Sequence, residues 1–129
     1  MADWLVKTEP GDYSFEDLRK EKETVWTGVK NPVALKNLRA MKTGDRVIVY
    51  HTGDEKAATG AATVTGFEEN PKNTAEPRVV IRAAKPLPRP IPLEEIKSLP
   101  LFSDSPLVRI GRLSVVPLTP AQYAFLTGA

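Results

Sequence analysis

The aromatic residues that could stack on a flat ligand are concentrated in the first half of the chain, with polar side chains between them. The aromatics are Trp4, Tyr13, Trp26 and Tyr50, and the polar residues near them are Lys7, Glu9, Ser14, Asn31, His51 and Thr52. Aromatic faces can stack on a heterocycle, while ammonium, amide, hydroxyl and imidazole groups can hydrogen-bond to its edge. The same aromatics could equally be core residues whose N–H and O–H groups are satisfied locally. Spacing alone leaves both interpretations open.

The common catalytic and metal-binding patterns do not occur in the sequence. His51 is the only histidine and there is no cysteine, so the sequence has neither a paired metal-ligand spacing nor a thiol nucleophile. It also contains no glycine-rich phosphate loop and no GxSxG nucleophile elbow. We therefore predict no catalytic residue, no metal and no cofactor. Without further information, His51 is most simply a strand-end imidazole hydrogen-bonded to the backbone.

Length and charge limit the classes of protein that the chain can belong to. With 129 residues, one domain over residues 1–129 is expected, and its core needs no disulfide. The 18 basic and 16 acidic residues give a net charge of only +2, too small for a protein that holds duplex DNA by phosphate contacts alone. No signal peptide and no apolar run of transmembrane length occurs, so we expect a soluble, cytoplasmic protein without a membrane partner, and a monomer.

Short strands and short helices follow one another along the chain. Strands are predicted at 3–7, 46–52, 59–67, 78–84 and around 112–116, and helices from Ser14 to about 20, from Pro32 to about 41, over 93–98 and after Thr119. A polar loop is expected at 68–76. Four prolines in the segment 85–92 exclude a central strand and predict an extended crossing of the surface. This pattern predicts an α+β domain built around a small curved sheet or barrel.

Several of these segments together resemble a known family. The motifs that carry the resemblance are Trp4 to Leu18, Trp26 to Asn31, Met41 to Thr52 and Arg112 to Pro117. They resemble, in the same order, motifs of the EVE domain, and the resemblance extends from about Trp4 to Phe125. It implies a PUA-like fold, a small mixed β pseudo-barrel with short flanking helices, related to the YTH domains that read methylated adenine in RNA.

The resemblance also implies a function. EVE domains are implicated in recognising modified bases, so the expected partner is DNA or RNA carrying methylated or hydroxymethylated cytosine, or methylated adenine. Trp26 is similar to the stacking residue of such a pocket and Lys7 to its lysine. The other expected ligand-binding residues are Tyr13, Ser14, Asn31, Tyr50, His51, Arg112 and Ser114, while Trp4 is expected to be structural. Local positive charge around the pocket is expected from Lys7, Lys30, Lys36, Arg39 and Arg112.

Three positions depart from the family pattern. Pro32 stands where the family has an aromatic residue, Leu35 or Lys36 where it has an arginine, and Val116 where it has a glutamine. These changes remove one potential stacking wall, one potential phosphate contact and one polar group. The fold is expected to survive them, but the identity of the modified base does not follow from the resemblance.

Two other functions remain open at this stage. One is a small hydrolase of modified nucleosides, because related ASCH domains use Lys, Thr and Glu, and Lys7, Thr8 and Glu9 are consecutive here. Consecutive residues of a strand point to alternate faces, which argues against three of them converging on one substrate. The other is a protein-interaction module that uses the extended proline-rich segment at 85–92.

Overall fold

A computed structural model describes residues 1–68 and 77–128 of the chain. The loop expected at 68–76 lies, except for its first residue, outside the described residues. The strands are β1 Asp3–Thr8, β2 Glu23–Trp26, β3 Arg46–His51, β4 Ala57–Glu68, β5 Arg78–Pro92 and β6 Val115–Leu118. The helices are α1 Phe15–Glu21, α2 Pro32–Ala40, α3 Leu93–Lys97, α4 Pro106–Arg109 and α5 Pro120–Thr127, with a 3-10 turn at Pro100–Phe102.

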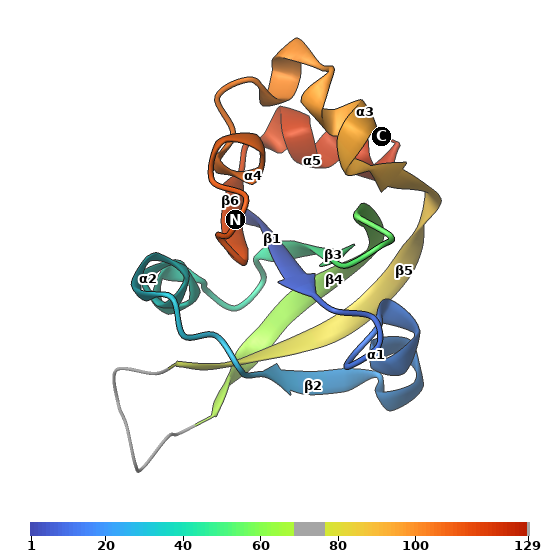
Figure 1. The fold of residues 1–129 in the computed structure, drawn as a ribbon. Coiled ribbons are helices and arrows are strands. Elements are labelled where there is room, and N and C mark those ends of the chain that lie inside the picture. The colour runs from blue at the N-terminus through green and yellow to red at the C-terminus, as the bar shows by residue number, and fades with distance from the viewer. Residues whose placement is uncertain (69–76, 129) are drawn as a thin grey trace.

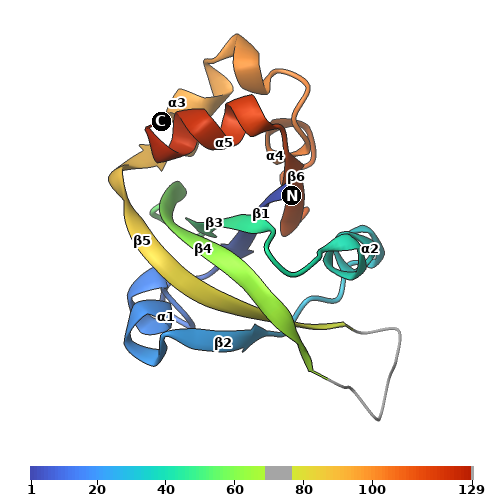
Figure 2. The same cartoon turned by 180° about the vertical axis from the view of Figure 1, so that it is seen from behind.

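All six strands form one mixed sheet in the order β2-β5-β4-β3-β1-β6. Strand β1 pairs in parallel with β3, and the other neighbours are antiparallel. The long strands β4 and β5 curve strongly, so the sheet curls without closing, and β2 and β6 form its edges (Figure 1). Helices α3, α4 and α5 lie over one end of the curled sheet, and α1 lies beside β2 at the other (Figure 2). The predicted α+β pseudo-barrel with short flanking helices is confirmed.

The helix starts follow the capping signals in the sequence. Ser14 caps α1 and Thr119 caps α5, each in a reciprocal capping box with the third helical residue. Asn31 caps α2 by accepting two backbone N–H groups, and proline follows it at the first helical position. These three helices have between seven and nine residues. Among the described residues, no helix is both long and apolar enough to span a membrane.

The proline-rich segment corrects the sequence prediction. The strand expected to end at 84 continues as β5 to Pro92, pairing with β4 along its length. Only Val79–Arg82 of β5 also pairs with β2, so within the described residues the prolines lie where β5 pairs with β4 alone. The prolines recur at every second residue, and Leu87 and Ile91 between them are buried. The extended conformation is therefore as predicted, but the segment belongs to the sheet rather than only crossing the surface.

Two further elements differ from the prediction. Strand β6 begins at Val115, so Arg112 and Ser114 precede it, and the segment before it contains the short helix α4. Strand β2 was not predicted because only four residues form it and its partner β5 lies far away in sequence.

Two close contacts tie the N-terminal elements together, one between α1 and β4 and one between β1 and the turn before β3. Phe15, the first residue of α1, packs so closely on Gly60 of β4 that a Cβ there would lie about 2.3 Å from the phenyl ring. Buried Asp45 accepts the indole N–H of Trp4 at 3.0 Å and the backbone N–H groups of Ala2 and Lys42. Burial alone would raise the pKa of Asp45, but these three donors lower it below its usual value. Trp4 is therefore structural, as expected.

Candidate nucleic-acid site

A cavity of about 180 Å³ opens between the end of β1, the turn before α1, and β2. Tyr13 and Trp26 form its aromatic walls, with ring centroids 6.2 Å apart and ring planes at 81°. The remaining lining residues are Thr8, Thr24, Val25 and Thr27. An edge-to-face aromatic pair with hydroxyl groups beside it can hold a small, flat, polar ring.

Trp26 is both a core residue and a cavity wall. Its side chain belongs to the hydrophobic core, and only 6% of the residue is exposed. No buried side-chain nitrogen or oxygen of the described residues lacks a hydrogen bond, and no partner is found there for the Trp26 indole N–H. The indole N–H therefore reaches solvent, and it is available to a ligand. The core interpretation is confirmed for this residue, and its role in binding a ligand stays a prediction.

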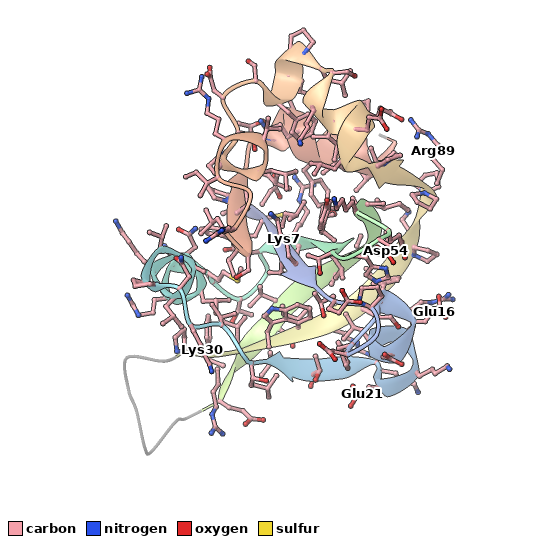
Figure 3. The ribbon with its side chains drawn as sticks, viewed as in Figure 1. Lys7, Glu16, Glu21, Lys30, Asp54 and Arg89 are labelled. Atoms are coloured by element: carbon pink, nitrogen blue, oxygen red, sulfur yellow. The ribbon has the colours of Figure 1, made fainter. Side chains whose placement is uncertain are left out.

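Tyr13 presents a neutral hydroxyl. Burial, and then its hydrogen bond to the Glu21 carboxylate, raise the pKa of Tyr13 to about 12. The carbonyl oxygen of Tyr13 accepts the Thr8 hydroxyl at 2.7 Å, which ties the turn to the end of β1. Figure 3 shows Glu21 at the end of α1, beside β2. The phenol therefore remains a hydrogen-bond donor at all ordinary pH values.

The two helix-capping residues among the predicted site residues use their side-chain oxygens within the fold. Ser14 Oγ accepts the N–H of Asp17, and the Ser14 N–H donates to the Asp17 carboxylate. Asn31 Oδ1 accepts the N–H groups of Val33 and Ala34, and the residue is exposed. Neither residue lines the cavity.

His51 joins β3 to α1. Its Nε2 accepts the backbone N–H of Phe15 at 3.0 Å, and its Nδ1 lies 3.1 Å from a carboxylate oxygen of Glu55. Because a backbone N–H can only donate, the proton of the neutral ring is on Nδ1. His51 is 7% exposed and does not line the cavity, so its ring positions the start of α1. This is the backbone-bonded role that the sequence left open.

The predicted residues Lys7, Tyr50 and Ser114 lie close together, and no contact brings Arg112 to them in the described part of the chain. Parallel pairing sets Lys7 beside Tyr50 and Thr8 beside His51, and successive residues of a strand face opposite sides. Thr8 therefore faces the Tyr13–Trp26 cavity while Lys7 faces away from it. Lys7 Nζ donates to the Gly111 carbonyl at 2.9 Å and lies 5.6 Å from the Tyr50 ring centroid. Ser114 accepts the Lys7 backbone N–H at 2.9 Å, and Arg112 is exposed.

Of the predicted set, the structure thus brings Tyr13 and Trp26 together in this cavity and Lys7 and Tyr50 together in a second one. Thr8, Thr24, Val25 and Thr27 were not among the predicted binding residues. The β-branched run Thr24-Val25 next to Trp26 was the signal that could have indicated a strand edge at this position. The binding roles of the two groups stay predictions.

The positions that depart from the family pattern have local explanations. Pro32 occupies the first position of α2, where its lack of an N–H is tolerated. Leu35 is half-buried and packs against the core, and Val116 is fully buried in β6 beside Leu5 of β1. Apolar residues at the last two positions therefore contribute to packing.

The candidate residues of a hydrolase do not meet in one place. Thr8 lines the Tyr13–Trp26 cavity and Lys7 faces the other side of the strand. Glu9 is exposed, and its carboxylate accepts the Gly11 N–H at 3.1 Å. The alternation expected along the strand is what separates them.

The chain belongs to the EVE domain family, whose pattern matches residues 2–129. Human thymocyte nuclear protein 1 is 30% identical over 95% of this chain and 71% of its own length. The NMR structure of a Rhodopseudomonas palustris protein, Rpa0253, superimposes with a TM-score of 0.90 at 32% identity, covering 99% of this chain and 92% of that one. The crystal structure of human thymocyte nuclear protein 1 in complex with 5-methylcytosine-containing DNA gives a TM-score of 0.89 at 25% identity, covering 99% of this chain and 96% of that one.

Proposed function

We propose that this EVE domain binds DNA and takes one modified pyrimidine base, such as 5-methylcytosine, into the cavity between Tyr13 and Trp26. The observation that carries the proposal is this cavity, in which an aromatic pair and three threonines surround a space of about 180 Å³. The complex of the human relative with 5-methylcytosine-containing DNA supports DNA as the partner.

The size of the cavity favours a single ring. Pockets for drug-sized molecules measure roughly 300–1,000 Å³, well above this one. One pyrimidine turned out of the stack is a ligand of suitable size and shape, and turning out a base is how proteins reach groups hidden inside a duplex. Among modified bases, the cavity thus favours cytosine derivatives over methylated adenine.

The chemistry of the walls suits a methylated pyrimidine. The Trp26 and Tyr13 rings offer π surface, and the Trp26 indole offers an N–H donor. The Tyr13 and Thr8 hydroxyls already donate within the fold, to Glu21 and to the Tyr13 carbonyl, so their oxygens can accept from the base edge. Val25 adds an apolar wall, and contact of this wall with a methyl group is more favourable than its contact with water. Recognition of the base edge therefore requires no charged residue inside the cavity.

The low net charge agrees with recognition of this kind. Stacking contributes about 1–3 kcal/mol per base, so affinity need not come from many phosphate contacts. The exposed Lys30 lies between β2 and α2, beside the end of the strand that carries Trp26 (Figure 3). It is placed to contact the phosphate backbone that flanks the base.

The test is a titration of matched oligonucleotides that contain cytosine, 5-methylcytosine, 5-hydroxymethylcytosine or methylated adenine, as DNA and as RNA. We expect tighter binding to a modified-cytosine DNA than to the unmodified strand. Trp26→Ala should remove this preference, losing about 1–3 kcal/mol of binding free energy. Trp26→Phe should retain part of it, because a phenyl ring still stacks.

The control variant is Tyr123→Ala, which truncates a half-buried aromatic on α5, away from the cavity lining. Thermal unfolding of each variant shows whether the fold persists. Equal binding to all oligonucleotides, or a preference that Trp26→Ala leaves intact, would exclude the proposed pocket.

A further inference from the structure

A second cavity, of about 170 Å³, lies on the other side of the end of β1. Its polar lining residues are Lys7, Lys56 and Lys97, which carry ammonium groups, and Tyr50 and Thr52, which carry hydroxyls. The rest of the lining consists of two glycines and apolar residues of α3 and α4, and no described residue that lines it is acidic. Three lysines and no acidic residue among the lining residues favour an anion in this space.

Lys7 shows that this charge is not neutralised within the fold. Its Nζ is hydrogen-bonded to the neutral Gly111 carbonyl and lies over the Tyr50 ring, and no carboxylate of the described residues pairs with it. Burial consequently lowers the pKa of Lys7, because part of the water that would solvate the ammonium has been removed. An anion in the cavity would offset this desolvation. Figure 3 shows Lys7 near the centre of the molecule, on β1.

Lys56 and Lys97 come from elements that are far apart in sequence and are held against each other. Lys56 lies between β3 and β4 with φ at 44°, a left-handed conformation that is uncommon for a residue other than glycine. Its carbonyl accepts the N–H of Leu93 at 2.8 Å, which ties this turn to the start of α3, the helix that carries Lys97. Within the described parts of the chain neither ammonium group has an ion-pair partner. A strained backbone that presents an unpaired cation to a cavity is typical of a binding site.

We infer that the cavity lined by Lys7, Lys56 and Lys97 is a phosphate-binding site, with Tyr50 and Thr52 as neutral hydrogen-bond donors. A phosphate group suits it because its several oxygens can accept from three ammonium groups and two hydroxyls at once. The phosphate can belong to a nucleic-acid backbone or to a small phosphorylated molecule. The site does not depend on the proposed base pocket, which uses the opposite side of β1.

One acidic residue lies at the rim of the site. The Glu9 carboxylate lies against Gly53, where an added Cβ would sit about 2.4 Å from a carboxylate oxygen. Its other oxygen accepts the Gly11 N–H, so the carboxylate is directed to its own turn rather than paired with a lysine. Glu9 therefore lies beside the cavity, next to the lining residue Gly53, but does not line it.

The first experiment titrates the full chain with inorganic phosphate at constant ionic strength and follows backbone amide signals by NMR. We expect saturable shifts at Gly53, Lys56 and Gly111. Lys56→Met and Lys97→Met should each weaken phosphate binding roughly tenfold, the scale of one lost hydrogen bond to a charged group. The control Lys42→Met removes an equal charge from an exposed lysine outside the cavity and should bind phosphate as the wild type does.

The second experiment identifies the source of the phosphate and separates this inference from the proposed function. If an unmodified DNA strand binds more weakly to the Lys56→Met, Lys97→Met double variant than to Lys42→Met, the site holds backbone phosphate. If the double variant binds DNA as Lys42→Met does but binds inorganic phosphate more weakly, the site serves a small phosphorylated molecule. Trp26→Ala should leave the phosphate response intact, whatever happens to base preference. The inference would be overturned if phosphate caused no saturable shift in the wild type, or if the double variant bound inorganic phosphate as tightly as the wild type.

Discussion

At the scale of single residues, neighbouring groups determine whether each candidate side chain is protonated and on which atom. The Tyr13 phenol is kept neutral by burial and by its bond to Glu21, and the His51 proton is placed on Nδ1 by the Phe15 N–H. Both protonation states follow from how α1 packs against the sheet. The Tyr13–Trp26 cavity is thus lined by neutral donors and acceptors, which suits a neutral base.

The raised pKa of Tyr13 gives a pH prediction. The ordinary value is 10.0 and the folded value about 12, so Tyr13 stabilises the fold fully below pH 10, and this contribution is lost as pH rises through 12. We expect the free energy of unfolding to fall more steeply over this range in the wild type than in Tyr13→Phe. Tyr50 and Tyr123, whose pKa values are also raised by burial, are common to both proteins and cancel in the comparison.

The measurement is an absorbance titration of tyrosinate in both proteins, combined with denaturant unfolding at each pH. The difference between the two titration curves reports Tyr13 alone. If Tyr13 ionises at its ordinary pKa, its phenol is solvated and is not held by burial and by Glu21 as described.

At the scale of elements, α1 is held on the sheet by its first residue. The Phe15 ring packs on Gly60 of β4, and the Phe15 N–H donates to His51 of β3. Tyr13 lies two residues before this anchor, in the turn that forms one wall of the cavity. The position of the wall therefore depends on how well α1 is docked.

His51→Ala should lower stability without changing which base is preferred. The substitution leaves a buried backbone N–H without its acceptor, a loss of about 1–3 kcal/mol in the free energy of unfolding. We expect the ratio of affinities for modified and unmodified oligonucleotides to remain within about twofold of the wild type, because His51 does not line the cavity.

Glu55→Ala is the matched control, because it removes only the half-exposed partner of Nδ1 and should cost at most about 1 kcal/mol. Chemical denaturation measures the stability of the wild type, His51→Ala and Glu55→Ala, and oligonucleotide titration measures their base preference. A His51→Ala protein of normal stability that has lost its base preference would show that the imidazole contacts the base.

The elements that depend on local sequence were predictable, and those that depend on distant partners were not. The capping pairs Ser14 with Asp17 and Thr119 with Gln122 lie three residues apart, so the helix starts were visible in the sequence. Strand β2 and the proline-rich half of β5 are defined by their pairing with distant strands, and local propensity did not reveal them.

The candidate site was predicted in the same partial way. The alternation that separates Lys7 from Thr8 follows from the strand alone, but the pairing of β1 with β3 decides which neighbours each acquires. The family resemblance named Trp26 and Tyr13 of the first cavity and Lys7 and Tyr50 of the second. The threonines of the first cavity, and Lys56 and Lys97 of the second, needed the tertiary structure.

At the scale of the whole molecule, the charge of +2 predicts weak salt dependence. If base capture supplies most of the affinity, two or three phosphate contacts suffice, and the logarithm of the association constant should fall with the logarithm of salt concentration with a slope of about −2. Titrations at several salt concentrations measure this slope. A slope of roughly −6 or steeper would indicate groove binding through many phosphates and contradict capture of a single base.

The most direct test of the central claim uses the two tryptophan indole N–H signals in an NMR titration with 5-methylcytosine DNA. The Trp4 indole donates to buried Asp45, whereas the Trp26 indole lines the cavity, so one molecule contains both the probe and its control. We predict that the Trp26 signal shifts and saturates with the modified strand, shifts less with the unmodified strand, and that the Trp4 signal stays in place. A Trp26 signal that does not move while the DNA binds would contradict base capture at this cavity.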